Sequence, residues 1–186
     1  MLNETLKIDK SGLILVEGKD EINFFKALLK KLNKDTNVQI IDVGGKTNFK
    51  FELPAVLNAT GFSENVKSLV IVRDADKNFD DAFKSIQGVL KKNNMSPPFK
   101  CNKFTNGDPK VGIYIMPGDS ENGMLEDLCL KTQEANPIMK CVDSFFNCLS
   151  TMPIKQPKNL SKAKSQVFLS AMPDIMPSVG LGALNG

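Results

Sequence analysis

Two patterns of hydrophobic and polar positions alternate along the first two thirds of the chain. Short unbroken apolar runs have the length and composition of strands buried on both faces of a sheet, and they occupy residues 13–17, 38–43, 68–73 and 111–116. Between them lie segments whose apolar residues recur at helical spacing, one from Glu21 onward and one from about Phe79 to Asn93. This alternation predicts an α/β fold with a parallel sheet.

The last third of the chain has helical periodicity only. "GMLEDLCLKTQ", "IMKCVDSFFNCLS" and "SKAKSQVFLSAM" predict helices. We therefore expect an α/β domain over residues 1–150 and a helical C-terminal extension over residues 151–186. The apolar ending "MPDIMPSVGLGALNG" leaves open whether it is a clipped terminus or a segment covered by a partner. In "FKFELPAVLNATG", Pro54 is expected to lie in the first turn of a short helix or to break it.

The composition narrows the class of protein. A chain of 186 residues fits one well-buried core. No apolar run approaches the roughly 18 residues that a membrane span needs, and the beginning "MLNETLKIDKSG" has no signal-peptide core, so we expect a cytoplasmic protein without membrane association. Four cysteines form no CxxC pair and histidine is absent, which excludes the usual zinc sites and favours free thiols. The net charge of +3 permits contact with phosphate backbones without requiring it.

Carboxylates stand at the ends of two predicted strands. Glu17 ends the first, and Asp74 and Asp76 follow the third. Residues two apart in an extended segment point to the same face, so the two aspartates are expected to converge, and Glu21 can turn back to the same edge. Ligands of parallel α/β sheets gather at this edge. The alternative for "DAD" alone is an acidic turn that caps the next helix.

Several carboxylates in one cleft repel one another unless a cation neutralises them. Because the chain offers oxygen ligands and no histidine, Mg²⁺ or Mn²⁺ fits better than zinc or copper.

The two acidic motifs together resemble a known domain. "LILVEGKDE", followed about fifty residues later by "LVIVRDADKN", resembles the Toprim domain of topoisomerases, bacterial-type primases, overcoming-lysogenisation-defect nucleases and small ribosomal-RNA maturation nucleases, over roughly residues 10–120. The resemblance implies a four-stranded, mainly parallel, Rossmann-like sheet flanked by helices. It also implies that Glu17 is a general acid or base or a metal ligand and that Asp74 and Asp76 bind magnesium. Glu21 matches an acid that many nuclease-type members have four positions after the glutamate.

The whole chain further resembles a stand-alone Toprim-like group of unassigned function, and "MPGDSENGMLEDL" is a further segment that carries this resemblance. Asp119 or Ser120 is expected to cap a helix there. Glu126, inside that helix, is a candidate ligand of a second metal site.

The resemblance implies phosphoryl transfer on nucleic acid, DNA or RNA. The chain's one tyrosine, Tyr114, lies in an apolar strand, which argues against a topoisomerase. The basic template-binding region and zinc-binding domain of a primase are not found in the sequence, so a nuclease or nuclease subunit is the simplest expectation. Candidate phosphate contacts are the Gly18 backbone and the side chains of Lys19, Arg73 and Lys77. Lys46 could also contact phosphate, but for this residue we favour a surface cation.

Two other classes of function stay open. One is a metal-dependent nucleic-acid-binding or regulatory module that cleaves nothing. The chain has no GxxxxGK[ST] motif, so an ATPase or other protein partner is a further expectation, as is a homo-oligomer. The other is a receiver-like domain that accepts phosphate on an aspartate, although this reading leaves Glu17 unexplained.

Overall fold

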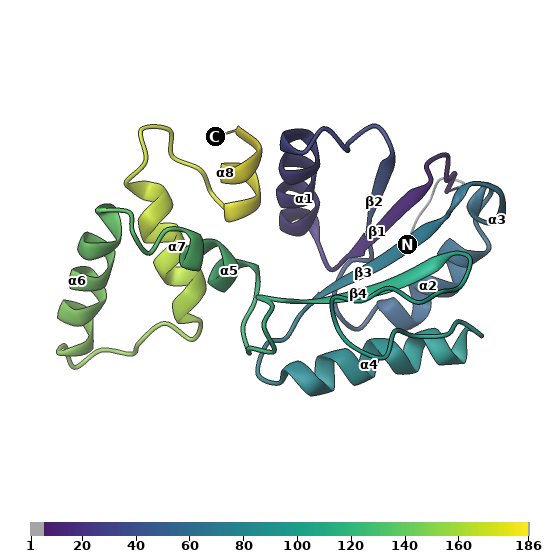
Figure 1. Ribbon diagram of the computed structural model, residues 1–186. Coiled ribbons are helices and arrows are strands. Elements are labelled where there is room, and N and C mark those ends of the chain that lie inside the picture. The colour runs from purple at the N-terminus through teal and green to yellow at the C-terminus, as the bar shows by residue number, and fades with distance from the viewer. Residues whose placement is uncertain (1–5, 186) are drawn as a thin grey trace.

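A four-stranded parallel sheet lies at the centre of the computed structural model, which describes residues 6–185 (Figure 1). The order of its strands is β2-β1-β3-β4, and all three pairings are parallel. The strands are β1 (Gly12–Val16), β2 (Val38–Asp42), β3 (Ser68–Asp74) and β4 (Lys110–Met116). Each predicted strand end lies within one residue of the observed end, so the expected α/β fold with a parallel sheet is confirmed.

One face of the sheet is closed by three helices, which are α2 (Phe49–Leu57), α3 (Phe62–Asn65) and α4 (Phe79–Lys92). We call it the α4 face. Alternate strand residues such as Leu15, Ile71 and Ile113 point to this side and are fully buried against Leu53 and Ile86. This cluster is the main core of the protein.

The opposite face, here called the α1 face, carries α1 (Lys19–Lys31), α5 (Leu125–Thr132) and α8 (Val179–Asn185). Helix α8 packs along α1 (Figure 1). A Cβ atom on Gly180 would lie 2.3 Å from the Asp20 carbonyl oxygen, so only glycine allows this close approach. The Ser178 hydroxyl also donates a hydrogen bond to the Asp20 carboxylate. Val179 and Gly180 of the apolar chain ending are thus buried, whereas Ile175 and Leu184 of the same segment remain exposed.

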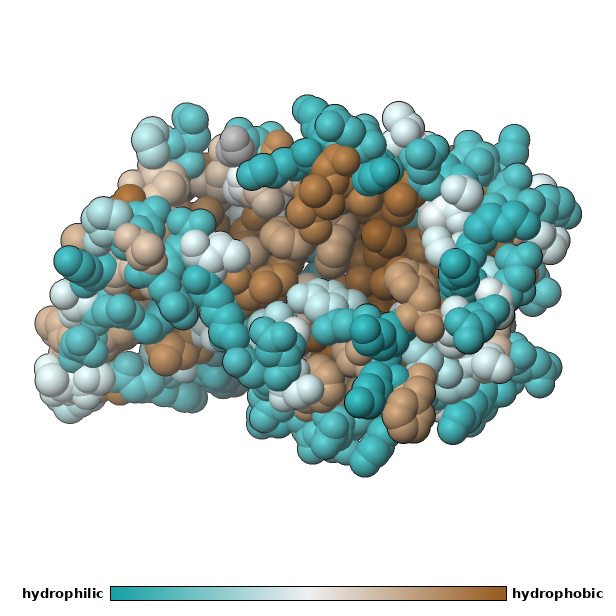
Figure 2. Space-filling model, in the orientation of Figure 1, coloured by the Kyte–Doolittle hydropathy of each residue, from teal (hydrophilic) through white to brown (hydrophobic). Residues whose placement is uncertain are grey.

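A second group of helices lies beyond the carboxyl ends of the strands (Figure 1). There α5 packs against α7 (Leu160–Ser170), and α7 packs against α6 (Ile138–Ser150) around Met139, Val142 and Phe146. The three predicted helices of the last third are therefore confirmed, whereas the domain boundary at residue 150 stays a prediction. Among the helices of residues 6–185, none is both long and apolar enough to cross a membrane. Figure 2 shows apolar side chains gathered in a hollow near the centre of the face it draws.

The prediction for Pro54 was wrong. Helix α2 begins at Phe49 and continues to Leu57, so Pro54 lies inside it, past the first turn. Proline has no N–H to donate to the carbonyl four residues earlier, which belongs to Lys50. Because Lys50 is exposed, water can satisfy this carbonyl and the helix persists.

Candidate functional site

Glu17 is held at the end of β1 by the neighbouring strand. Leu15 is opposite Ile71, so Glu17 is level with Arg73 and points to the same side of the sheet. Arg73 Nε lies 3.7 Å from Glu17 Oε1, and the same oxygen accepts a hydrogen bond from the Asp74 N–H (3.1 Å). Only 15% of the Glu17 side chain is exposed. The acid at the end of the first strand is therefore a largely buried group fixed to β3, which is not the geometry of a solvated loop residue.

Asp74 connects the sheet to the second group of helices. It is the last residue of β3, and strand alternation turns its side chain away from that of Arg73, toward the start of α5. Its Oδ1 accepts a hydrogen bond from the Leu125 N–H (3.1 Å), one of the free amides at the N-terminus of α5. The next residue, Glu126, is 9% exposed, so a second acid is buried at the same helix end.

Asp76 is not arranged as the sequence predicted. The strand ends at Asp74, and Asp76 has a positive φ of 53°, so the two residues do not share an extended segment. The Asp76 backbone instead exchanges hydrogen bonds with Gly123 (2.8 and 2.9 Å). Its carboxylate forms an ion pair with Lys46 (2.7 Å), which is therefore more than a solvated surface cation.

Glu21 folds back over the turn that precedes α1. A Cβ atom on Gly18 would lie 3.2 Å from Glu21 Oε2, so the glycine gives this carboxylate room close to the backbone. The Gly18 φ of −161° is extended, and its role is the close approach rather than a left-handed turn.

Burial and mutual repulsion shape the protonation of these acids. Burial, and after it the charges of Glu17, Glu21, Glu126 and Asp76, together raise the pKa of Asp74 to about 8. Burial also raises the pKa of Glu17 to about 7, against the lowering effects of the Asp74 N–H and of Arg73. The pKa of Glu21 is raised by burial and then by the charges of its acidic neighbours. The nearby cations therefore leave the negative charge of this edge incompletely neutralised.

The donor chemistry of this edge fits a hard divalent cation, because its acidic side chains offer carboxylate oxygens. Within residues 6–185, no three Asp, Glu or Cys side chains stand close enough together to enclose a metal ion as they are arranged here. The residues that would hold one are Glu17, Asp74 and Asp76, with Glu21 and Glu126 beside them. Their assignment as ligands stays a prediction.

The predicted phosphate contacts occupy different environments. Lys19 and Lys77 are exposed, whereas Arg73 is turned toward Glu17, and its buried Nε has no hydrogen-bond partner within residues 6–185. Lys162 was not predicted. It reaches from α7 to within 3.7 Å of Glu126, and nothing in the lysine-rich segment "NLSKAKSQ" distinguishes it.

The predicted helix cap at Asp119 or Ser120 was wrong. Both residues have positive φ angles, 51° and 62°, in a turn that precedes α5. The helix begins at Leu125 instead, and Asp127 Oδ2 accepts a hydrogen bond from the Met124 N–H (2.8 Å). Glu126 is consequently in the first turn rather than one turn inside the helix.

Fold and site together define an α/β protein with buried carboxylates at the carboxyl edge of a parallel sheet. Residues 11–176 match the family described as "Protein of unknown function (DUF3226)", and the chain belongs to this family. No curated protein matches the chain.

Solved structures give two likenesses. The crystal structure of the hypothetical protein PH0156 from Pyrococcus horikoshii OT3 is similar with a TM-score of 0.56 and 21% identity, over 76% of this chain and 73% of that chain. The C-terminal region of the OLD protein from Xanthomonas campestris pv. campestris gives a TM-score of 0.41 at 18% identity, over 95% of this chain and 77% of that chain. The first likeness supports the fold and does not extend to function.

Proposed function

We propose that the protein is a Mg²⁺- or Mn²⁺-dependent phosphoryl-transfer protein that acts on nucleic acid, most simply a Toprim-type nuclease or nuclease subunit. The observation that carries the proposal is the junction of Glu17 and Asp74. Two largely buried acids from the ends of neighbouring parallel strands are joined through the Asp74 N–H, at the edge where α/β proteins bind ligands. The resemblance of both motifs to Toprim sequences supports the assignment.

Each residue then has a role that follows from its place. Asp74 and Asp76 would hold the cation together with Glu17, and Glu21 and Glu126 would complete its surroundings. A divalent cation supplies charge neutralisation and polarisation of the phosphodiester. Glu17, which is restrained by β3 and largely shielded from water, would move a proton during the reaction.

The cations of the edge support a phosphate-bearing substrate. Arg73 lies beside Glu17, and although its buried Nε is engaged only in the 3.7 Å ion pair with Glu17 and makes no hydrogen bond within residues 6–185, a guanidinium group at this edge would attract a phosphate. Lys19 and Lys77 each lie within one of the two acidic motifs and are exposed, so they are available to an approaching nucleic-acid backbone.

The test incubates the purified protein with plasmid, linear duplex, single strands and structured RNA, each in Mn²⁺, in Mg²⁺ and in chelator. We expect metal-dependent cleavage of at least one substrate and its loss in Glu17→Gln, which keeps the shape and removes the charge. Glu64→Gln, at an exposed position on α3, is the matched control and should cleave as the parent does. Cleavage by Glu17→Gln at the parental rate would refute the catalytic role of this residue.

A second candidate function is a metal-dependent nucleic-acid-binding or regulatory module without catalysis. It is favoured by the ion pairs that already engage two of the acids, Arg73 with Glu17 and Lys46 with Asp76. In that case the same substrates should bind in Mg²⁺ and be released by chelator, with no product at any time. Binding measured by fluorescence anisotropy separates the two functions.

A further inference from the structure

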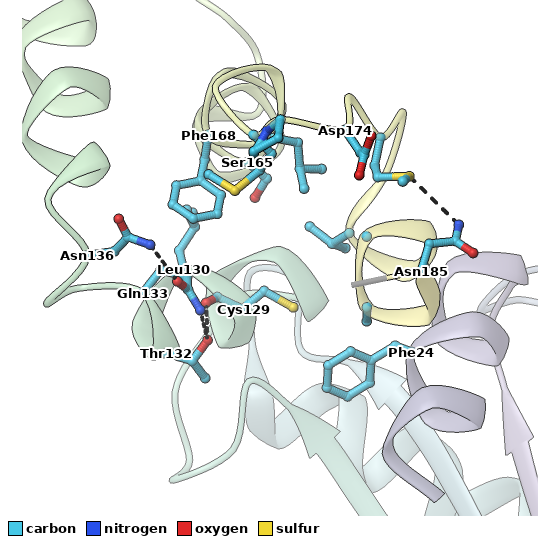
Figure 3. A pocket seen from close by; sticks show the side chains of 17 residues that line it. Phe24, Cys129, Leu130, Thr132, Gln133, Asn136, Ser165, Phe168, Asp174 and Asn185 are labelled. Carbon is cyan, nitrogen blue, oxygen red and sulfur yellow. Dashed lines mark hydrogen bonds between the residues drawn. The ribbon is translucent and has the colours of Figure 1, made fainter. Parts of the chain in front are cut away.

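A cavity of about 470 Å³ lies among α1, α5, α7 and α8 (Figure 3). Its volume falls in the range of small-molecule sites. Apolar side chains dominate its wall, among them Phe24 from α1, Leu130 from α5, Phe168 from α7 and Met176 from the segment before α8. Four helices from distant parts of the sequence thus line one mainly apolar space that is open to solvent on one side.

One polar group inside this wall has no partner. Ser165 of α7 is 4% exposed, and its hydroxyl makes no hydrogen bond within residues 6–185. Figure 3 draws its side chain among those that line the cavity. A buried hydroxyl without a partner is unfavourable, and a molecule in the cavity that offers a hydrogen bond would remove this penalty.

The charges around the cavity restrict what it can hold. None of the described residues that line it is a lysine or arginine, and the one acid among them, Asp174, is exposed. An anionic group would therefore enter without a cation to pair with and would meet a like charge. Burial raises the pKa of the Cys129 thiol in the wall to about 12, so this group is neutral as well.

We propose that this cavity is a binding site for a neutral, mainly apolar small molecule with one hydrogen-bonding group, which pairs with the Ser165 hydroxyl. The proposal does not depend on the proposed phosphoryl-transfer function, because none of the candidate metal or phosphate residues lines the cavity. The experiment uses two probes with the same aromatic body: neutral N-phenyl-1-naphthylamine and the anionic anilinonaphthalene sulfonate.

We expect the neutral probe to bind the full-length protein saturably, one molecule per chain, with a rise in fluorescence. The sulfonate should bind at least about tenfold more weakly, since its charge is desolvated without a partner. Ser165→Ala should raise the Kd of the neutral probe by roughly two- to tenfold, which corresponds to the loss of one hydrogen bond.

Two substitutions on opposite walls fill the cavity: Cys129→Phe from α5 and Ala183→Phe from α8. Each should abolish binding, and Cys141→Phe, at an exposed cysteine of α6, is the matched control that should bind like the parent. Circular dichroism and melting temperature establish whether each variant is folded. If only one of the two filled variants folds, that variant alone tests the proposal.

The proposal is overturned if the folded parent shows no saturable binding of the neutral probe. It is also overturned if the probe binds unchanged to both filled variants, because the probe then occupies another surface.

Discussion

Asp74→Asn separates the charge of Asp74 from its structural contact. The asparagine side-chain oxygen can still accept the Leu125 N–H, which is 3.1 Å from Asp74 Oδ1, so the link to α5 is kept. What is lost is a negative charge that burial and four neighbouring acids disfavour. The substitution should therefore stabilise the protein in chelator, although it alters a candidate metal ligand.

The size of the effect follows from the pKa of Asp74, which is raised from 3.8 to about 8. A shift of about 4 units corresponds to roughly 5–6 kcal/mol at pH values above 8. The asparagine amide also loses solvation on burial, which removes part of this gain. We expect Asp74→Asn to raise the free energy of unfolding by about 2–4 kcal/mol at pH 8.

The pH dependence has a definite sign. Because the pKa of Asp74 is higher in the folded protein than in the unfolded chain, the folded state binds more protons between pH 4 and 8. The stabilisation by the protonated form is complete at low pH and is lost as the pH rises through about 8. Glu17, with its pKa raised to about 7, acts in the same direction. In chelator the parent should lose stability from pH 5 to pH 9, and Asp74→Asn should show a flatter profile.

Urea denaturation in chelator at pH 5, 7 and 9 measures these profiles. Asp35→Asn, at an exposed aspartate, is the control and should follow the parent. The reasoning is refuted if Asp74→Asn is less stable than the parent at pH 9, or if its pH profile has the parental slope.

Three further predictions test the edge and the helix packing. Mg²⁺ or Mn²⁺ should stabilise the parent by about 2.7 kcal/mol at a concentration a hundred times Kd and so raise its melting temperature. The double variant Asp74→Asn with Asp76→Asn should show no such rise. An equal rise in the double variant would mean that the metal binds elsewhere. Gly180→Ala should destabilise the protein by about 1–3 kcal/mol in urea denaturation, because the added Cβ would clash with the Asp20 backbone. Gly88 of α4 has open space around it, so the control Gly88→Ala should stabilise the protein by about 0.5–1 kcal/mol. Lys162→Ala should change stability by less than about 1 kcal/mol, since the side chain is 60% exposed, yet weaken nucleic-acid binding measured by anisotropy if this lysine faces the substrate.

The strands and the position of Glu17 could be predicted because each depends on a local pattern. An unbroken apolar run becomes a buried strand, and parallel strands bring their carboxyl ends to one edge. This reasoning placed Glu17 near Asp74, where the structure has them joined by a hydrogen bond.

The other features of the site could not be predicted, because they depend on contacts between residues that are distant in the sequence. The alternation of side chains along a strand predicts the direction of the Asp76 side chain only if the strand extends to Asp76. The strand ends at Asp74 instead, and the Asp76 backbone pairs with Gly123. Lys46 and Lys162 come from other elements, and no spacing in the sequence links them to the acids they meet. The cap of α5 failed for the same reason, because the turn at Asp119 and Ser120 delays the start of the helix.

Helix α5 joins the acidic edge to the rest of the molecule. Its first amide binds Asp74, and one turn later its Cys129 and Leu130 side chains line the apolar cavity. A helix that is held at one end by a carboxylate of unfavourable charge responds to the protonation or neutralisation of that carboxylate, because the Leu125 N–H interacts more strongly with an ionised acceptor than with a neutral one. Neutralising Asp74 in place and filling the cavity at Cys129 therefore act on the same eight-residue helix, one at its N-terminus and the other in its middle. Additivity of the two substitutions in unfolding free energy would mean that α5 transmits nothing between them, whereas a coupling energy beyond about 0.5 kcal/mol would show that it does.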